Sequence, residues 1–212
     1  LDRNELAKAA PSGGLIAEDS ALPWLASDRE DSEQPPRYDP AKAREILEKA
    51  GWDKVNEEGI RVKTEKSAAA KKSSPAHEIL LQFTLTTSDW PDLVSVAERI
   101  RTQLKEVGIQ VAIEKMPFDE LELNVIRPRN FEMLLFGEVY GYEPDPFAFW
   151  HSSQTKAPGL NITLYSNKKA DTLLEEARRT ADSEMRNERY EAFSKMLKED
   201  RPALFLFSQL YF

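Results

Sequence analysis

The side chains of this chain best suited to binding chemistry are concentrated in residues 137–150, where acidic and aromatic residues alternate with glycines and prolines. Carboxylates can hold amines and hydroxyls, aromatic rings can stack on a solute, and glycines allow a ligand to approach the backbone closely. We therefore predict ligand contacts in this segment and one more from an aromatic residue that lies between a predicted strand and a predicted helix. The predicted contacts are Glu138, Tyr140, Tyr142, Glu143, Asp145, Trp150 and Trp90.

Each of these residues also has a structural interpretation. The aromatic residues of the segment are equally suited to packing beneath a long loop, because aromatic side chains bury readily. Asp145 precedes Pro146, a pairing that favours capping of a short helix over contact with a ligand. Trp90 faces a binding cleft or packs on its own lobe, and Trp24 lines the cleft or anchors an irregular segment.

The sequence contains few of the motifs that catalysis or cofactor binding requires. The only histidines, His77 and His151, lie far apart in sequence, and the chain contains no cysteine, so neither a metal-binding motif nor a thiol nucleophile is present. There is no Gly-x-Ser-x-Gly motif and no glycine-rich phosphate loop. We expect no cofactor and no enzyme activity. The alternative is a glycoside hydrolase that uses two carboxylates among Glu138, Glu143 and Asp145.

Charge and hydropathy narrow the class of partner. The 212 residues carry 29 basic and 37 acidic side chains, a formal net charge of -8, which argues against nucleic acid because phosphate binding needs a basic face. The apolar runs are strand-sized and too short to span a membrane. The chain starts at Leu1 without an apolar leader, which we interpret as the middle of a longer sequence.

The elements that would position the candidate residues follow an α/β rhythm. Apolar residues predict strands over residues 79–86, 109–114 and 131–136, and an amphipathic helix from Pro91 to Val107 joins the first two. The candidate segment follows the third strand. An open α/β sheet binds ligands at the carboxyl ends of its strands, so this is where a ligand is expected.

Other segments have clear signals of their own. Asp39 and Pro40 begin a helix whose apolar face includes Ile46, and Gly51 ends it. A less regular helix is predicted over residues 118–125. Two helices capped by Asn167 or Ser166 and by Asp182 end the chain, the second with Met185 facing inward, and a strand follows over residues 203–207. Residues 1–38 form an irregular entry segment after a short helix, and residues 53–78, with a lysine- and serine-rich tract, a mobile insertion.

Four stretches in this order resemble the C-terminal portion of family 5 extracellular solute-binding proteins of ABC transporters, the oligopeptide- and dipeptide-binding type. These are residues 2–5, residues 38–52 with their proline-capped helix, residues 97–111, and a final series of matching positions. The final series comprises residues 142–146, Asn161, Asp171, Arg186, Tyr190, Glu199, Asp200 and Pro202. We expect Asn161, Asp171 and Arg186 to serve in capping and surface pairing.

The resemblance implies a periplasmic-binding-protein-like (type II) single lobe, an open mixed sheet flanked by helices, with residues 1–212 forming the second lobe. Such a protein captures a solute between two lobes and delivers it to a membrane permease. The implied partners are a peptide or small-molecule ligand, the ABC permease and the N-terminal lobe of the same chain. The resemblance also implies a monomeric protein that is periplasmic or extracellular. As a lipoprotein, the full-length protein would be anchored to the membrane.

One departure from the peptide-binding members bears on the solute. They place an aspartate three residues before the aspartate of an Asp-Pro pair, where it holds the free amino group of the peptide. If Asp145–Pro146 is that pair, Tyr142 stands at the aspartate position, and a phenol does not neutralise an ammonium. Either Glu138 or Glu143 substitutes for it, or the solute is an oligosaccharide or another molecule without a free amine.

Overall fold

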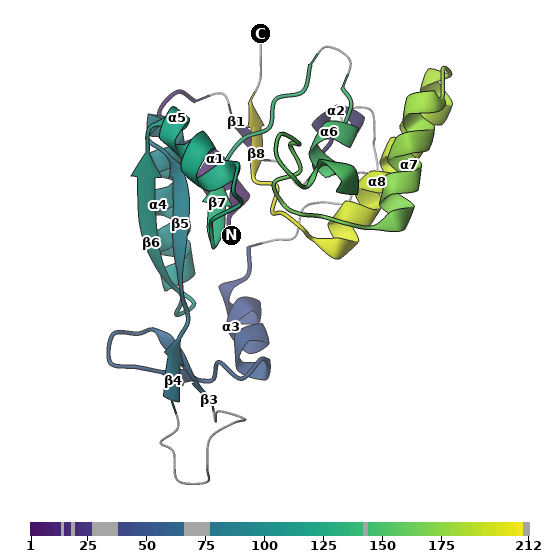
Figure 1. Ribbon diagram of the computed structural model, residues 1–212. Coiled ribbons are helices and arrows are strands. Elements are labelled where there is room, and N and C mark those ends of the chain that lie inside the picture. Colours follow the sequence, from purple (N-terminus) through teal and green to yellow (C-terminus); the bar gives the residue numbers. More distant parts are fainter. Residues whose placement is uncertain (14, 18–19, 27–37, 66–76, 142–143, 210–212) are drawn as a thin grey trace. The chain divides into compact units, whose positions relative to one another are not determined.

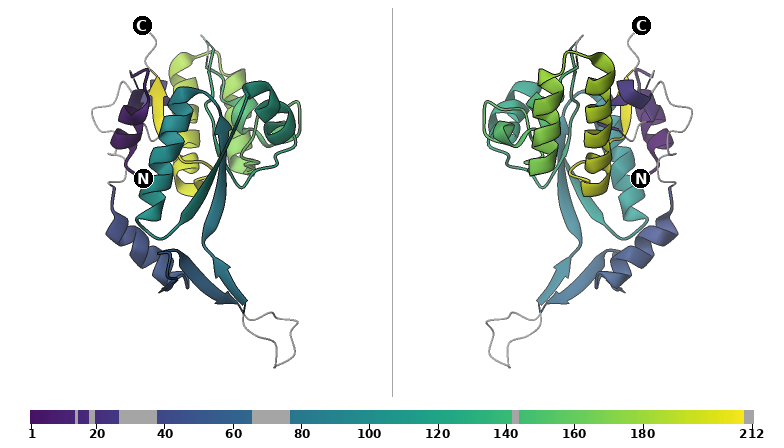
Figure 2. Two further views of the ribbon diagram at one scale, coloured as in Figure 1. Left: turned by 90° about the vertical axis from the view of Figure 1, so that its left-hand side faces the viewer. Right: turned by 90° about the vertical axis from the view of Figure 1, so that its right-hand side faces the viewer.

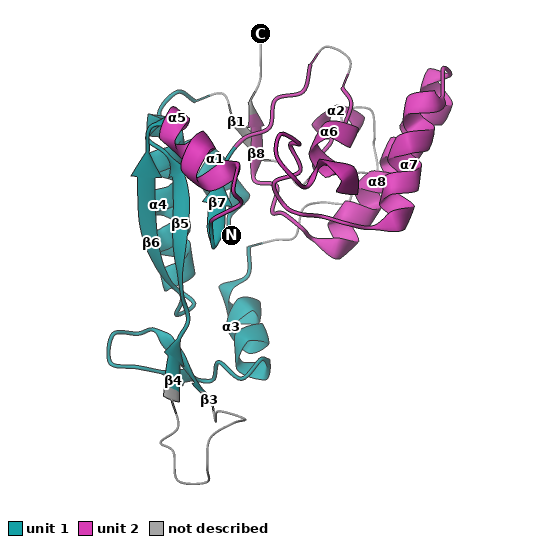
Figure 3. Ribbon diagram, viewed as in Figure 1, with its two compact units in different colours: residues 1–13, 36–117, 131–136 teal, residues 14–35, 118–130, 137–212 magenta. Residues whose placement is uncertain are grey.

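The computed structural model describes the chain except residues 14, 18–19, 27–37, 66–76, 142–143 and 210–212 (Figure 1). The chain divides into two compact units, coloured separately in Figure 3. Unit 1 comprises Leu1–Gly13, Pro36–Pro117 and Phe131–Phe136, and unit 2 comprises Gly14–Pro35, Phe118–Asn130 and Gly137–Phe212. Each unit is described by itself below.

Unit 1 contains a three-stranded sheet in the order β6-β5-β7, with β5 (Gln82–Ser88) in the centre and β6 (Gln110–Met116) and β7 (Met133–Leu135) both parallel to it. Helix α4 (Pro91–Lys105) connects β5 to β6 and packs along the sheet through Val96, Ala97 and Ile100, all of which are buried (Figure 2). The predicted strand–helix–strand unit is therefore present. Parallel strands need such a crossover because a tight turn cannot join them.

The second sheet of unit 1 is antiparallel, in the order β2 (Lys54–Val55), β3 (Arg61–Glu65) and β4 (His77–Leu80). The sequence predicted one strand over residues 79–86, and this was wrong, because the run divides at Leu81 into β4 and β5. The backbone N–H of Leu81 donates to Arg61, and its carbonyl accepts from Gln110. One apolar run thus supplies strands to two different sheets.

Arg61 holds this division in place. Its side chain is buried, with Nε donating to the Val107 carbonyl at 2.8 Å and Nη1 to the Trp52 carbonyl at 2.5 Å. Gly108 (φ 85°) lies against it, since a Cβ there would stand 2.7 Å from Arg61 Cγ. Only glycine fits this left-handed, closely packed position.

Two further helices belong to unit 1, α1 (Arg3–Ala9), capped by Asp2, and α3 (Pro40–Lys49), capped by Asp39 as predicted. The prediction that α3 buries an apolar face was wrong. The helix has no buried residue, and Ile46 is 56% exposed, although its spacing is that of an amphipathic helix.

Unit 2 is mainly helical. Helices α7 (Lys168–Arg179) and α8 (Ser183–Asp200) lie side by side, and Asn167 and Asp182 cap them as predicted (Figure 2). The short elements are α2 (Pro23–Ala26), α5 (Phe118–Leu121), the π-helix η1 (Glu122–Ile126), α6 (Phe147–Trp150) and the 3-10 helix η2 (Ser152–Gln154). The less regular helix predicted near residue 120 is this α5–η1 pair.

The core of unit 2 is built around Trp150 and Phe193, which are 1% and 0% exposed. The prediction that Met185 faces inward was wrong, because it is half exposed in the first turn of α8. The final strand was also misplaced. The structure has β8 at Phe207–Gln209, antiparallel to β1 (Leu15–Ala17), a pairing between distant segments that local sequence does not signal.

The α/β class is confirmed, with one refinement. The β6-β5-β7 sheet is parallel throughout, and the antiparallel strands form two separate sheets, β2-β3-β4 and β1-β8. Within the described residues, no helix has the length and hydropathy required to cross a membrane.

Candidate ligand-binding site

The segment after β7 enters unit 2 at Gly137 and carries a chain of polar contacts. Trp150 Nε1 donates to the Tyr140 hydroxyl at 3.1 Å, and this hydroxyl donates to Glu138 Oε2 at 3.4 Å. The Trp150 side chain is in the core, whereas Tyr140 and Glu138 are half-buried. A buried indole therefore fixes the position of a phenol that faces a carboxyl group.

Burial dominates the acid–base properties of both groups. It raises the pKa of Glu138 to about 8, opposed by the hydrogen bond from Tyr140, and it raises the pKa of the Tyr140 phenol as well. Glu138 is consequently a neutral acid at pH 7, and Tyr140 remains a phenol. A carboxyl group in this state can donate a hydrogen bond, and it gains a charge when the surroundings favour one.

Aromatic rings surround the tyrosine. The ring of Trp24 meets Tyr140 edge-on at 4.8 Å between centroids, and Phe149 meets it edge-on at 4.9 Å. All three residues are half-buried and pack against the core of unit 2. Helices α2 and α6, which are distant in sequence, thus bring two rings to the loop that carries Tyr140.

Asp145 is occupied by structural contacts. Its Oδ1 accepts from the backbone N–H of Phe147 at the start of α6, and its Oδ2 accepts from Arg178 Nε at 2.7 Å. The Arg178 guanidinium lies over the Phe147 ring at 3.7 Å, and this ring stacks on His151 at 4.0 Å. The structural interpretation of Asp145, capping of a short helix, agrees with this geometry.

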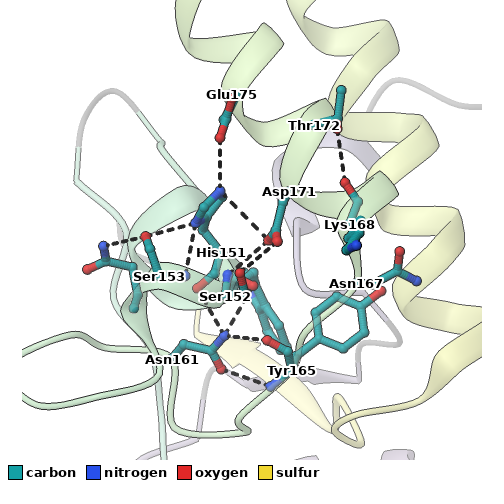
Figure 4. A network of polar contacts seen from close by, with 12 residues as sticks. His151, Ser152, Ser153, Asn161, Tyr165, Asn167, Lys168, Asp171, Thr172 and Glu175 are labelled. Carbon is teal, nitrogen blue, oxygen red and sulfur yellow. Dashed lines mark hydrogen bonds and ion pairs between the residues drawn. The ribbon is translucent and has the colours of Figure 1, made fainter.

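Behind the loop lies a network of polar contacts centred on Asn161 (Figure 4). The fully buried Asn161 amide donates to the carbonyls of Trp150, His151 and Tyr165 at 3.1, 3.2 and 2.9 Å, and its oxygen accepts from the Tyr165 N–H. A surface role for Asn161 was therefore a wrong prediction, since the side chain ties together three backbone carbonyls inside unit 2.

Helix α7 completes this network. Asp171 accepts from the Ser152 N–H at 2.9 Å and from its hydroxyl at 2.7 Å, which fixes the start of η2. His151 Nε2 faces Glu175 Oε1 at 3.5 Å and Asp171 Oδ1 at 3.8 Å (Figure 4). Arg186, the third residue expected to serve in pairing, donates to the Thr180 carbonyl at the turn between α7 and α8.

In unit 1 the other predicted contact, Trp90, is 63% exposed at the carboxyl end of the central strand β5. The three polar residues before Asp89 are buried, and Thr87 donates to the Leu135 carbonyl at 2.9 Å. Trp90 begins α4 without a side-chain cap of its own. An exposed tryptophan held between a rigid strand and a helix is well placed to contact a ligand.

The structure thus separates the predicted ligand contacts into accessible side chains, buried supports and residues that it does not describe. Glu138 and Tyr140 come together in unit 2, and Trp90 lies on unit 1. Trp150 is 1% exposed, so its place in the fold is that of a support for Tyr140 rather than of a ligand contact. Tyr142 and Glu143 lie outside the described residues. Phe149 and Trp24 are not among the predicted contacts, because nothing in the local sequence shows that their rings meet that of Tyr140.

Other possible sites are weak. The described residues contain no group of three or more histidine, cysteine, aspartate or glutamate side chains that could hold a metal ion. A shallow pocket in unit 1 is lined by Glu5, Lys8, Ala9 and Arg99, none of which is a predicted contact.

Comparison with known proteins gives a consistent picture. Residues 1–161 match the family model "Bacterial extracellular solute-binding proteins, family 5 Middle". The oligopeptide-binding protein AppA of Bacillus subtilis (strain 168) is 31% identical over 172 residues, which are 80% of this chain and 29% of AppA. The matched residues therefore span less than a third of this relative.

Solved structures show the same similarity in three dimensions. AppA from Bacillus subtilis in complex with a nonapeptide has a TM-score of 0.79 and 27% identity, covering 99% of this chain and 40% of AppA. An oligopeptide-binding protein from Thermus thermophilus complexed with a pentapeptide (TM-score 0.76, 21% identity, 99% and 36% covered) has the same fold. So has NikZ from Campylobacter jejuni in complex with Ni(L-His) (TM-score 0.75, 24% identity, 99% and 40% covered).

Proposed function

Since the chain belongs to the family 5 bacterial extracellular solute-binding proteins, we propose that it is part of the substrate-binding component of an ABC importer, with a peptide as the favoured solute. The observation that carries this proposal is the family match over residues 1–161 together with 31% identity to an oligopeptide-binding protein. The acidic and aromatic loop after β7 supports it, because its groups suit a solute with both polar and apolar parts.

In this proposal residues 1–212 are the second lobe of a two-lobe protein, with residues 1–38 as its entry segment and 53–78 as an insertion. The first lobe would be supplied by further residues of the same protein, since this chain covers 40% of the AppA structure. The protein would act as a periplasmic or extracellular monomer, free or lipid-anchored, and pass its solute to a membrane permease. Its role is binding without catalysis.

The proposed ligand contacts are Trp90 in unit 1 and Glu138 and Tyr140 in unit 2, with Asp145 and Trp150 as supports. Two of the predicted contacts, Tyr142 and Glu143, remain proposals that rest on sequence alone. Glycoside hydrolysis is the less favoured function because Asp145, one of the three acids of the loop, is paired with Arg178 and accepts the Phe147 N–H at the start of α6.

One observation favours a second type of solute for the same fold. Glu138 has a pKa of about 8, so at pH 7 it is a neutral hydrogen-bonding acid beside aromatic rings. Sugar hydroxyls pair with such groups, and sugar faces stack on aromatic rings. An oligosaccharide is therefore the alternative to a peptide.

Ligand-dependent thermal stabilisation tests the proposal. The full-length protein would be screened against pools of peptides from two to nine residues, oligosaccharides and metal chelates, because a ligand that binds the native state raises the melting temperature through RT ln(1 + [L]/Kd). We expect peptide pools to raise the melting temperature. A shift with oligosaccharides alone selects the alternative, and turnover of a glycoside without any shift contradicts a binding function.

A further inference from the structure

Ser153 and His151 form a hydrogen-bonded pair at the start of η2 that the proposed binding function does not use. Ser153 Oγ lies 2.8 Å from His151 Nδ1, and the backbone N–H of Ser153 donates to the same nitrogen at 3.1 Å (Figure 4). A backbone N–H can only donate, so Nδ1 is an acceptor and the neutral imidazole carries its proton on Nε2. The Ser153 hydroxyl therefore also donates its proton to Nδ1.

The other side of the imidazole faces negative charge. His151 Nε2 lies 3.5 Å from Glu175 Oε1 and 3.8 Å from Asp171 Oδ1, both of which are on α7. Within the described residues this buried nitrogen makes no hydrogen bond. The His151 ring stacks on Phe147 at 4.0 Å, with 15° between the two planes, which holds the ring in one orientation. Carboxylates behind an imidazole stabilise the cation that forms when the imidazole accepts a proton.

One positive charge also lies close to the imidazole. The Arg178 guanidinium lies over the Phe147 ring at 3.7 Å, and it would oppose a second cation on the stacked histidine. Arg178 is itself paired with Asp145, whose Oδ2 accepts from its Nε at 2.7 Å. The two carboxylates of α7 are therefore the charges that act most directly on His151.

The serine is exposed to solvent, although its hydrogen-bond acceptor is buried. The side-chain amide of Gln154 donates to Ser153 Oγ at 3.1 Å. An amide N–H beside an attacking oxygen can turn to the oxyanion that develops next to it. The adjacent Ser152 has a different partner, since its hydroxyl donates to Asp171 Oδ2 at 2.7 Å, and a carboxylate is a weaker base than an imidazole. Ser153 is therefore the hydroxyl of this turn that has a base beside it.

We propose that Ser153 is a nucleophile, with His151 as its general base, and that it accepts the acyl group of small activated esters. An exposed hydroxyl, a base 2.8 Å away and groups that orient the base are the parts that activate a serine. None of these residues is a proposed ligand contact. The inference goes beyond the proposed binding function and does not rest on it.

The step is an acyl transfer. Ser153 Oγ forms a bond to the carbonyl carbon of the ester while its proton passes to His151 Nδ1. The bond between this carbon and the leaving oxygen then breaks, and the leaving phenol takes the proton from His151. Nothing is oxidised or reduced, and no further reactant is needed. The step consumes one acyl donor for each protein molecule, so it modifies the protein without requiring turnover.

The experiment is acetylation of the full-length protein by p-nitrophenyl acetate, with the modified serines identified and quantified over time by mass spectrometry of peptides. Ser183, the exposed first residue of α8, is the internal control, because no hydrogen bond joins it to a histidine in the described part of the chain. We expect Ser153 to be acetylated at least about 100-fold faster than Ser183, since a positioned general base contributes about 100- to 10,000-fold.

Two variants test the base and the charge behind it. His151→Asn keeps a side-chain oxygen that can cap the Ser153 N–H but removes the imidazole, so acetylation of Ser153 should slow to the rate of Ser183. Glu175→Gln removes one charge at a side chain that is 45% exposed, and it should slow Ser153 about two- to fivefold. This difference should shrink in about 1 M salt, as an effect of charge does and an effect of altered packing does not.

Glu176→Gln is the matched control, because Glu176 is the next residue of α7 and pairs with Arg189 instead of facing His151. It should leave the Ser153 rate unchanged. Equal rates at Ser153 and Ser183 in the parent protein overturn the proposal, and so does rapid acetylation of Ser153 that persists in folded His151→Asn. If His151→Asn does not fold, Glu175→Gln decides, and a Ser153 rate equal to that of the parent protein then contradicts the proposal.

Discussion

Asn161 should be among the most sensitive positions of unit 2, although it touches no candidate ligand contact except through Trp150. Its side-chain nitrogen lies 2.9–3.2 Å from the carbonyls of Trp150, His151 and Tyr165, and its oxygen accepts from the Tyr165 N–H and the Thr163 hydroxyl. Asn161 itself is fully buried. These bonds are therefore made out of contact with bulk water.

The magnitude for Asn161→Ala follows from this arrangement. Two amide hydrogens shared by three carbonyls and one bond to a backbone N–H amount to about three full hydrogen bonds, each worth about 1 kcal/mol net. Leaving buried groups unsatisfied adds to this, so we expect the free energy of unfolding to fall by about 3–4 kcal/mol. The measurement is urea denaturation of the full-length protein, followed by tryptophan fluorescence because the buried Trp150 accepts a hydrogen bond from Asn161 through its carbonyl.

A second substitution separates hydrogen bonding from packing. Asn161→Asp keeps the shape but turns a carboxylate toward three carbonyl oxygens, so the folded state would raise the pKa of this aspartate. A raised pKa means that the variant loses further stability as the pH rises above about 4, by up to about 1.4 kcal/mol per pH unit. At pH 5 it should be more stable than at pH 7, unlike Asn161→Ala.

Exposed Asn187 on α8 provides the matched control, and Asn187→Ala should change the unfolding free energy by less than about 0.5 kcal/mol. A loss below about 1 kcal/mol for Asn161→Ala would show that the buried amide does not organise the loop. The reasoning would also be refuted by an Asn161→Asp variant whose stability does not depend on pH.

Two predictions concern unit 1. Gly108→Ala should lower the free energy of unfolding by about 1–3 kcal/mol, because the residue has φ 85° and the new Cβ would stand 2.7 Å from Arg61 Cγ. The same urea denaturation measures this loss. An unchanged free energy of unfolding would show that the Arg61 side chain moves away freely. Tyr38 should titrate late, since the hydrogen bond to Glu106 raises the pKa of its phenol to about 12. The stability from this bond is present below pH 10 and is lost as the pH rises toward 12. In absorbance titrations, the difference between parent and Tyr38→Phe should show this late step, and Glu106→Gln should move it to lower pH.

Elements that depend on local signals were predictable from the sequence. Asp39 with Pro40, Asn167 and Asp182 begin their helices as expected, because a capping side chain and the first turn lie within a few residues of each other. The division of one apolar run at Leu81 was not predictable, since it depends on bonds to Arg61 and Gln110, twenty or more residues away. The register with distant strands decides where an apolar run divides into two strands, and hydrophobic periodicity carries no information about that register.

The candidate site shows the same division. The concentration of acids and aromatic rings after β7 is visible in the sequence, and so is the position of Trp90 between a strand and a helix. The roles within the segment are not. Trp150 and Tyr140 are both aromatic and ten residues apart, yet one is a buried support and the other half-buried beside Glu138, because only the folded core decides which ring it encloses.

These contacts also bear on selectivity. Tyr140 is held by the buried Trp150 indole, and Asn161 is hydrogen-bonded to the backbone of Trp150, so fixing the Tyr140 side chain on binding costs little conformational entropy. Among the described residues, the side chain of Glu138 receives one hydrogen bond, from Tyr140. A solute that adds a second hydrogen bond to this largely buried carboxyl group is therefore favoured over one that leaves it with the first bond alone.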